Sequence, residues 1–507
     1  IALPKGWFPT HINAQLTKDL TADFVAMKPK VEARVLTESE AINGLGSDSG
    51  LHGLDFSAGA GFPLKHMFPT EKKEHFFENV GIDVPHRIIN TQLPLRGLLD
   101  SLERALEAGQ QPIPVSYIFP KDELRSPNKV DKPRPVLADS LAFTIVMRKY
   151  FGSVWAAFLG SHREMWSAVG MDVHSSDWDC MMHYLTEVGD KGFDADIKAM
   201  DSTVSQPVVD SFVICVNAWY DRYGQPNPKA NAIRAALGRG VIKTFLVIGK
   251  RMFLKTNGNT TGGFLTTFLN SFAVRFYLMG SHLMAPPDDL NFRGLTPFRR
   301  HVRTKTFGDD SIVCISDEML PHFNGARFQN VMSSINIQIT RADKAPGDIE
   351  TKSIFDCQFL SGSTTLRTKH HPNSAQYWHN PDDVSLAQVN CWRTNSVDPT
   401  EAAAEAADVT LRRVFGRGSI EFNKIRGEYA ELFAKKGIAV ALISFAELTA
   451  AYNNKRSASS FGDYGPDSFT TQADSEGVRI MDGTASSASQ SGAVSTLGDA
   501  ARAANED

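Results

Sequence analysis

The sequence is poor in cysteine and has no long apolar run. Its cysteines are odd in number and have no paired spacing: Cys180, Cys215, Cys314, Cys357 and Cys391. This pattern disfavours a disulfide framework or a zinc knuckle and favours a reducing compartment. No stretch reaches the roughly 18 apolar residues that a membrane span needs, and no signal peptide is visible. We therefore expect a cytosolic protein without a transmembrane segment, in which the glycosylation sequon at 259–261 has no role.

An excess of positive charge is also missing. The chain has 53 Lys and Arg against 57 Asp and Glu, a formal net charge of −4. Bulk electrostatics therefore do not indicate a basic nucleic-acid-binding protein. Positive charge gathers locally in residues 121–134 and in a second cluster, for which a solvated face is at least as good an interpretation: Arg299, Arg300, Arg303 and Lys305.

Two adjacent carboxylates, Asp309 and Asp310, follow Gly308 between two stretches that alternate polar and apolar residues. This pattern predicts a β-hairpin with the carboxylates at its tip. Paired acids repel one another, and a divalent cation is the usual compensation. Gly-Asp-Asp alone is weak evidence, because both residue types are ordinary in turns.

Two further aspartates lie upstream. Residues 193–197 predict a short strand that carries Asp196, and Asp201 or Ser205 could cap a helix through residues 208–219. An acid on one strand and a pair on a neighbouring hairpin would form a site for two hard cations about 3.5–4 Å apart. Such a site can activate a hydroxyl and neutralise a transferring phosphoryl group.

Residues 260–270 form the third element. Two glycines, 262 and 263, predict a flexible loop, and phenylalanines at 264, 268, 272 and 276 have helical spacing. Thr266 and Asn270 lie one helical turn apart, so they share a face and could both point at one ligand hydroxyl.

Together, these motifs resemble, in their order, the RNA-dependent RNA polymerases of positive-strand viruses, closest to the picornavirus-like group. The resemblance extends from about Gly53 to about Lys424, although Thr261 stands where the family has serine. It implies an α+β right-hand fold with fingers, a palm of antiparallel sheet plus helices, and a helical thumb. The expected boundaries are 1–190 for fingers, 191–381 for palm (with 224–256 returning to fingers), 382–454 for thumb and 455–507 for a disordered tail.

The resemblance also implies template-directed RNA synthesis from ribonucleoside triphosphates by two-metal nucleotidyl transfer, replicating a positive-strand viral genome. Two Mg²⁺ ions, replaceable by Mn²⁺, would be held by Asp196, Asp309 and Asp310, and Lys344 would protonate the leaving pyrophosphate. The implied nucleotide-binding residues are Lys121, Arg125, Lys132, Arg134, Asp201, Thr261, Gly262, Thr266 and Asn270. The implied RNA-binding residues are Lys129, Arg148, Ser57, Gly59 and Phe359.

The partners that the resemblance implies are template and product RNA, ribonucleoside triphosphates, a small protein primer and other viral replication proteins. The expected location is the host cytoplasm, at membrane-associated replication complexes, and the chain is expected to lack part of its native amino end. Two alternatives stay open. A reverse transcriptase shares the palm, but Asp201 and Asn270 favour ribonucleotides. An inactive, RNA-binding scaffold is opposed by the intact Asp196, Asp309 and Lys344.

Overall fold

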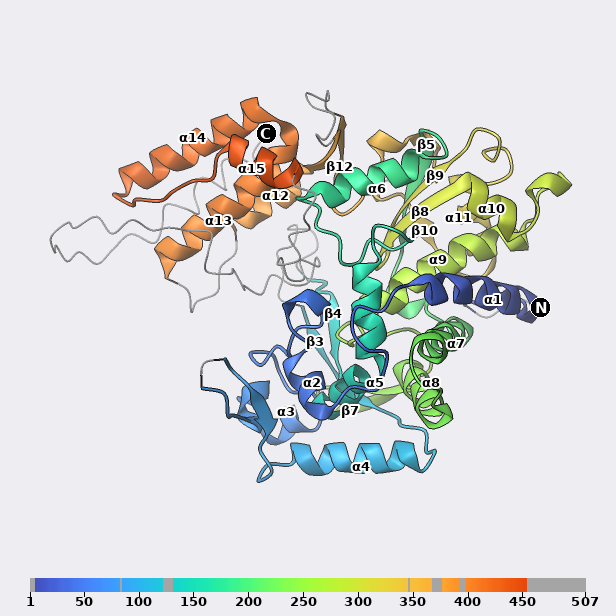
Figure 1. Ribbon diagram of the computed structural model, residues 1–507, viewed down its shortest axis with the longest axis vertical. Helices are drawn as coiled ribbons and strands as arrows, with labels where there is room; N and C mark the ends of the chain where they lie inside the picture. The colour runs from blue at the N-terminus through green and yellow to red at the C-terminus, as the bar shows by residue number, and fades with distance from the viewer. Residues whose placement is uncertain are drawn as a thin grey trace. The chain divides into compact units, whose positions relative to one another are not determined.

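The computed structural model describes residues 5–82, 84–121, 131–344, 347–366, 376–391 and 398–453 (Figure 1). The expected tail at 455–507 lies outside these residues. The chain forms two compact units. The first holds the described residues up to 171 and from 183 to 359, and the second holds 172–182 and the described residues from 360 onward. Helices and mixed sheets make the fold α+β, as predicted.

An antiparallel sheet forms the centre of the first unit, with the strand order β10-β5-β9-β8 and a short β11 that also pairs with β5. The predicted strand and hairpin are both confirmed. Asp196 on β5 lies opposite Asp310 on β9, and Phe307 pairs with Asp310 across the hairpin turn. Gly308 has a φ of +60°, which glycine adopts without strain, so this turn requires it. The strands are β5 (Lys191–Ile197), β8 (Val302–Phe307), β9 (Asp310–Ile315), β10 (Ile339–Thr340) and β11 (Lys352–Ser353).

Helices of the first unit pack around one aromatic core. The ring of Phe24 lies 5.8 Å from those of Phe268 and Phe272 and 6.0 Å from that of Phe212. These rings join three helices that lie side by side in Figure 1, α1 (Thr10–Ala26), α7 (Gln206–Tyr223) and α9 (Thr266–Met284). The predicted phenylalanine spacing therefore belongs to a buried helix, although α9 begins after Phe264.

The start of α7 differs from the prediction. Ser205 occupies the N-cap position, but its hydroxyl makes no capping bond and donates instead to the Gly6 carbonyl at 2.7 Å. A Cβ at Gly6 would lie 2.6 Å from the Thr203 carbonyl, so the amino-terminal segment runs closely against this turn. The chain near Asp201 is thus held from the amino end of the protein.

A second sheet has the order β4-β3-β6-β7. A hairpin turns at Gly249-Lys250, where Ile248 pairs with Arg251. Its strands are β3 (Val115–Pro120), β4 (Pro135–Ala138), β6 (Thr244–Ile248) and β7 (Arg251–Lys255). The other helices and strands of the first unit include α3 (Leu64–Met67), β1 (Phe77–Asn79), β2 (Arg87–Ile89), α4 (Leu95–Glu107), α5 (Leu141–Gly160), α8 (Pro228–Ile242), α10 (Leu295–His301) and α11 (Gly325–Ser334).

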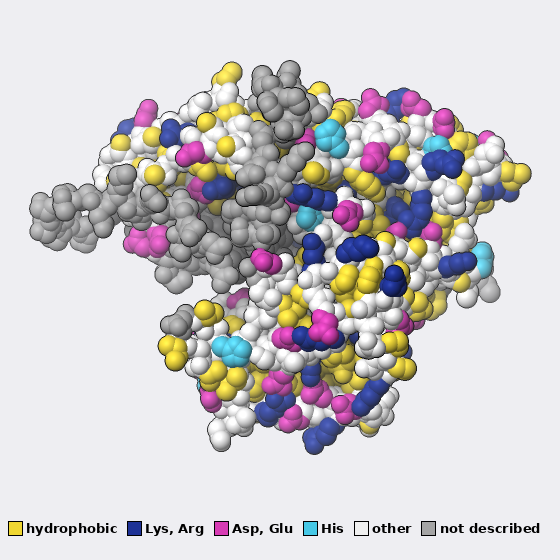
Figure 2. All heavy atoms as spheres, in the orientation of Figure 1, with side chains coloured by type: hydrophobic (Ala, Val, Ile, Leu, Met, Phe, Trp, Pro, Cys, Tyr) yellow, Lys and Arg dark blue, Asp and Glu magenta, His cyan; other side chains and the backbone are white. Residues whose placement is uncertain are grey.

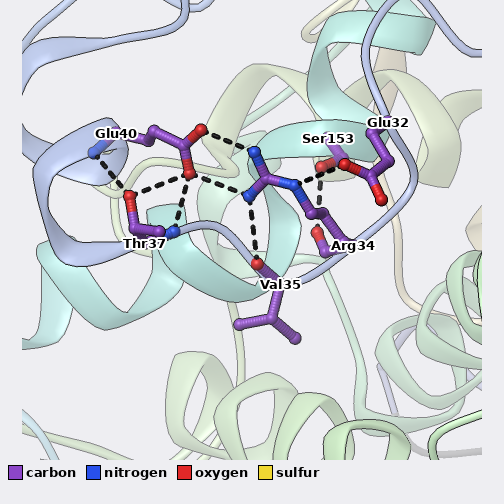
Figure 3. Close-up of polar contacts among 6 residues, drawn as sticks. All are labelled: Glu32, Arg34, Val35, Thr37, Glu40 and Ser153. Carbon is purple, nitrogen blue, oxygen red and sulfur yellow. Dashed lines mark hydrogen bonds and ion pairs between the residues drawn. The ribbon is translucent and has the colours of Figure 1, made fainter.

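A polar cluster fixes the segment before α2 (Glu38–Asn43) to α5 (Figure 3). Thr37 and Glu40 form a capping box, and the Arg34 guanidinium lies 2.6 Å from the Glu40 carboxylate. This hydrogen bond lowers the pKa of Glu40 to about 2. Ser153 on α5 donates to the Arg34 carbonyl at 2.9 Å, so the cluster joins residues that are far apart in the sequence.

The described part of the second unit consists of helices and one hairpin. The hairpin packs on the helices through Trp378, whose ring stacks on Phe415 at 4.3 Å. The hairpin strands are β12 (Gly362–Leu366) and β13 (Tyr377–Pro381). The helices are α6 (Ser176–Thr186), which continues into the first unit, α12 (Asp383–Val389), α13 (Pro399–Val414), α14 (Ser419–Lys435) and α15 (Phe445–Asn453). In the described part of the chain, no helix has the length and apolar character needed to cross a membrane.

Candidate active site

Carboxylates from two adjacent strands meet at one end of the central sheet. Asp196 ends the described pairing of β5 with β9, where it faces Asp310, and Asp309 occupies the hairpin turn. Asp309 stays accessible at the tip, yet surrounding protein atoms withdraw its carboxylate from bulk water. This burial first, and then the negative charge of Asp196, raise the pKa of Asp309 to about 6. Asp196 thus lies on a strand next to the hairpin that carries Asp309 and Asp310, as the sequence predicted.

Lys344 lies beside this group. Its ammonium nitrogen is 3.8 Å from Oδ2 of Asp196. Burial raises the pKa of Asp196, and the Lys344 charge opposes that shift. The neighbouring Asp343 forms an ion pair with Arg341 at 2.7 Å.

The carboxylates fit a partial set of metal ligands. No group of three or more His, Cys, Asp or Glu side chains among the described residues is arranged as a complete cation site. Mg²⁺, however, is usually held by one or two carboxylates together with waters and substrate phosphates. Burial and then the charge of Asp196 disfavour the ionised form of Asp309, and a bound cation would favour that form. Asp196 and Asp309 therefore suit a cation that a nucleotide's phosphates help to hold.

Asp201 and Asn270 form the next pair. The Asn270 amide nitrogen donates to Oδ1 of Asp201 at 3.2 Å. Thr266, which the sequence placed on the same helix face, behaves differently. Its hydroxyl is directed at the carbonyls of Thr260 (2.5 Å) and Gly263 (2.8 Å), so it closes the preceding loop instead of joining Asn270 at one ligand.

The loop before α9 is bound to β4. The Leu137 amide donates to the Thr261 hydroxyl at 2.7 Å, and the Gly262 amide donates to the Leu137 carbonyl at 2.9 Å. A Cβ at Gly262 would lie only 2.6 Å from that carbonyl, which explains the glycine. The Thr261 hydroxyl, predicted to bind nucleotide, thus fastens the loop to the second sheet.

The structure describes only some of the basic residues that follow β3. The Lys121 amide donates to the Arg134 carbonyl at 2.7 Å, so these two residues continue the pairing of β3 with β4. Lys132 and Arg134 are exposed. Arg125 and Lys129 lie outside the described residues.

Two predicted RNA contacts are contradicted by burial. Arg148 is 7% exposed, and its guanidinium donates to the carbonyls of Ala41 and His52. Arg148 therefore holds the segment that contains Ala41 and His52 against α5. Its position within an apolar helical run already indicated that its side chain is buried. Phe359 is 1% exposed and belongs to the core. Ser57 and Gly59 are exposed, with the Ser57 hydroxyl donating to Asp55 at 2.6 Å.

Most side chains of the second basic cluster bind carbonyl or carboxylate groups of the protein. The Lys305 ammonium is fully buried and donates to the carbonyls of His162 and Met165. Arg299 forms ion pairs with Asp19 and Asp23. On the face shown in Figure 2, Lys and Arg side chains are interspersed with Asp and Glu.

Comparison with known proteins identifies the relatives of this chain. The family model described as viral RNA-dependent RNA polymerase matches residues 2–395. The chain is 24% identical to the genome polyprotein of Rice tungro spherical virus (strain Vt6) over 88% of its length. It is 23% identical to that of Deformed wing virus over 83%, and 24% identical to the replicase polyprotein of Cricket paralysis virus over 80%. It spans only 13%, 15% and 23% of these three polyproteins, respectively.

A solved structure shows the same fold. The chain matches a sicinivirus 3Dpol RNA-dependent RNA polymerase with a TM-score of 0.68 and 22% identity. The match covers 89% of this chain and 86% of that chain, so the predicted polymerase fold is confirmed. Members of the matched family generally use divalent metal ions.

Proposed function

Because the chain belongs to the viral RNA-dependent RNA polymerase family, we propose that it extends RNA on an RNA template by two-metal nucleotidyl transfer. Its substrates would be ribonucleoside triphosphates, and its role would be replication of a positive-strand viral genome. The observation that carries the proposal is the placement of Asp196 on β5 directly opposite Asp310 on β9, with Asp309 in the adjoining hairpin turn.

Asp196 and Asp309 would hold two Mg²⁺ ions, with Asp310 assisting and Mn²⁺ as a substitute. When bound, such ions supply activation of the 3′-hydroxyl and charge neutralisation at the α-phosphate. Placement of Asp196 and Asp310 on paired strands supports this role, because a sheet fixes ligand positions better than a loop does.

Lys344 would donate a proton from its ammonium group to the leaving pyrophosphate. The ammonium of Lys344 lies 3.8 Å from Asp196, and this distance supports the role. Asp196 would bind the metal, and the metal would bind the phosphates, so a side chain beside Asp196 also lies near the phosphates. Lys121, Lys132 and Arg134 would neutralise the triphosphate, and Arg125 would join them as the resemblance implies.

Asp201 and Asn270 would bind the 2′-hydroxyl of the incoming nucleotide. The carboxylate would accept a hydrogen bond from the hydroxyl, and the amide NH₂, which has two hydrogens, can donate to the hydroxyl oxygen while keeping its bond to Asp201. The proposal also includes, from the family resemblance, a small protein primer, other viral replication proteins and membrane-associated replication complexes in the host cytoplasm.

Extension of a pre-annealed RNA primer on an RNA template, with Mg²⁺ and the four ribonucleotides, tests the proposal. Asp196→Asn and Asp309→Asn should abolish extension while the proteins still melt cooperatively. Asp317→Asn is the matched control, because Asp317 is an exposed partner of Lys191 at the other end of β5. Normal extension by either of the first two variants would overturn the assignment of the site.

A further inference from the structure

A second amide side chain, that of Asn259, lies beside the proposed sugar site. Asn259 is 3% exposed, and its amide nitrogen donates to Oδ1 of Asn270 at 3.2 Å. Its backbone N–H donates to the Asp201 carbonyl at 2.6 Å. Gly258 makes this approach feasible, since a Cβ there would lie 2.2 Å from the same carbonyl. Asn259 thus bonds to Asp201 through its backbone and to Asn270 through its side chain.

Backbone groups determine which way these amides face. The Thr260 N–H donates to Oδ1 of Asn259 at 2.8 Å, and the Thr266 carbonyl lies 3.5 Å from the Asn259 amide nitrogen. A backbone N–H can only donate and a carbonyl can only accept, so the Asn259 amide has one orientation. Its NH₂ then faces the oxygen of Asn270, and the NH₂ of Asn270 must face Asp201.

The residue that orients Asn259 is itself anchored to the second sheet. The Thr260 hydroxyl donates to Oδ2 of Asp139 at 3.1 Å, and the Ser116 hydroxyl of β3 donates to Oδ1 at 2.7 Å. The Lys255 ammonium donates to the carbonyls of Gly258 and Val241, at 2.7 Å each. A hydrogen-bonded chain therefore runs from β3 through Asp139, Thr260 and Asn259 to Asn270.

We infer that Asn259 is a positioning residue for sugar selection, held in place by Thr260 and Asp139, and that it fixes the Asn270 amide with its NH₂ toward Asp201. The inference rests on the proposed function and deepens it. A ribose 2′-hydroxyl can then donate to Asp201 and accept from Asn270 at the same time. If the Asn270 amide were reversed, its oxygen would face a carboxylate, and the donor for the 2′-hydroxyl would be lost.

The test compares single-nucleotide addition of matched ribo- and deoxyribonucleotides on an RNA primer–template. Asn259→Leu keeps the approximate shape and removes the amide. Asn257→Leu is the control, because Asn257 lies two residues away in the same loop and its amide donates to the Ser202 carbonyl at 3.2 Å. We expect the ribo-to-deoxy ratio of kcat/KM to fall about tenfold or more in Asn259→Leu, and to stay within about twofold in Asn257→Leu.

A second pair covers the case in which Asn259→Leu does not fold. Thr260→Val removes the hydroxyl that bonds Asp139, whereas Thr260→Ser keeps it. The ratio should fall in Thr260→Val and be preserved in Thr260→Ser. An unchanged ratio in folded Asn259→Leu, or in Thr260→Val where the former does not fold, overturns the inference. Failure of the wild-type chain to extend RNA would instead refute the proposed function.

Discussion

The ammonium nitrogen of Lys344 lies 3.8 Å from Oδ2 of Asp196, one of the carboxylates at the proposed metal site. Lys344 has a φ of +58°, a conformation that few residues other than glycine adopt, so the turn aims this side chain at some conformational cost. When Asp196 holds a cation, its attraction for the ammonium falls. The same lysine can therefore neutralise Asp196 in the free protein and turn to a phosphate in the complex.

Asp309→Asn should change stability with a definite pH dependence. The pKa of Asp309 is raised from 3.8 to about 6 in the folded protein, so the folded state binds this proton more tightly than the unfolded state does. The wild type therefore loses stability as pH rises from 3.8 through about 6, and the asparagine variant lacks this loss. The melting temperature of Asp309→Asn, measured relative to that of wild type, should therefore increase as pH is raised from 3.8 to about 6.

Mg²⁺ should raise the melting temperature of wild type more than that of Asp309→Asn. A cation that binds only the folded state stabilises it, and the wild type offers both carboxylates. Adding Mg²⁺ at pH 7.5, a pH chosen as about 1.5 units above the raised pKa, should raise the melting temperature of wild type more than that of Asp309→Asn. Equal Mg²⁺ shifts in the two proteins would argue against Asp309 as a ligand, and Asp317→Asn should behave as wild type.

Asn259 and Asn270 should be non-additive in sugar selection. Asn270→Ala removes the donor that faces Asp201, so the ribo-to-deoxy ratio of kcat/KM should fall. If Asn259 acts only by orienting Asn270, then Asn259→Leu should have no further effect on the ratio in the Asn270→Ala background. A double-mutant cycle on the ratio measures this coupling, and simple additivity would show that Asn259 acts by another route.

Lys305→Met should destabilise the protein without specifically weakening RNA binding. The substitution removes the ammonium donor of the part-buried His162 carbonyl and of the buried Met165 carbonyl, at a cost of about 1–3 kcal/mol in the free energy of unfolding. Arg300→Met, on an exposed neighbour, should change it by less than about 0.5 kcal/mol. Denaturant unfolding gives both values. If Lys305→Met were as stable as wild type yet bound RNA with a weaker salt dependence, Lys305 would be an RNA contact after all.

Local patterns predicted the central hairpin and β5 because strand alternation and a glycine turn depend on neighbouring residues. The position of Asn259 was not predictable in this way. Its significance comes from bonds to Asp201 and Asn270, which only the folded chain brings together, and locally it looked like an irrelevant glycosylation site.

The same reason explains the errors about basic residues. A sequence pattern cannot distinguish a cation that faces RNA from one that satisfies buried carbonyls, as Arg148 and Lys305 do. Arg148 carried a partial signal, because long apolar runs on both sides place it on a helix that is buried all round. A charged residue in such a helix is more simply explained as a structural donor.

Lys344→Leu should slow catalysis more than it weakens nucleotide binding, and Lys344→His should recover part of the rate. A positioned general acid typically contributes about 10²–10⁴-fold, because pyrophosphate leaves more readily when it is protonated as the bond breaks. Leucine keeps bulk but cannot donate, whereas histidine donates with its own pH dependence. Both substitutes have a Cβ, so the positive φ affects them much as it affects lysine.

Pre-steady-state addition of one nucleotide across a pH series is the deciding measurement for Lys344. Lys352→Leu is unsuitable as a control, because its ammonium pairs with the buried Asp194 at 2.6 Å. Lys191→Leu is better matched, since Lys191 is an exposed partner of the exposed Asp317. The rate should fall steeply in Lys344→Leu and stay near wild type in Lys191→Leu. Equal rates for Lys344→Leu and wild type at every pH would exclude Lys344 as the acid, because no proton that it supplies could then be limiting.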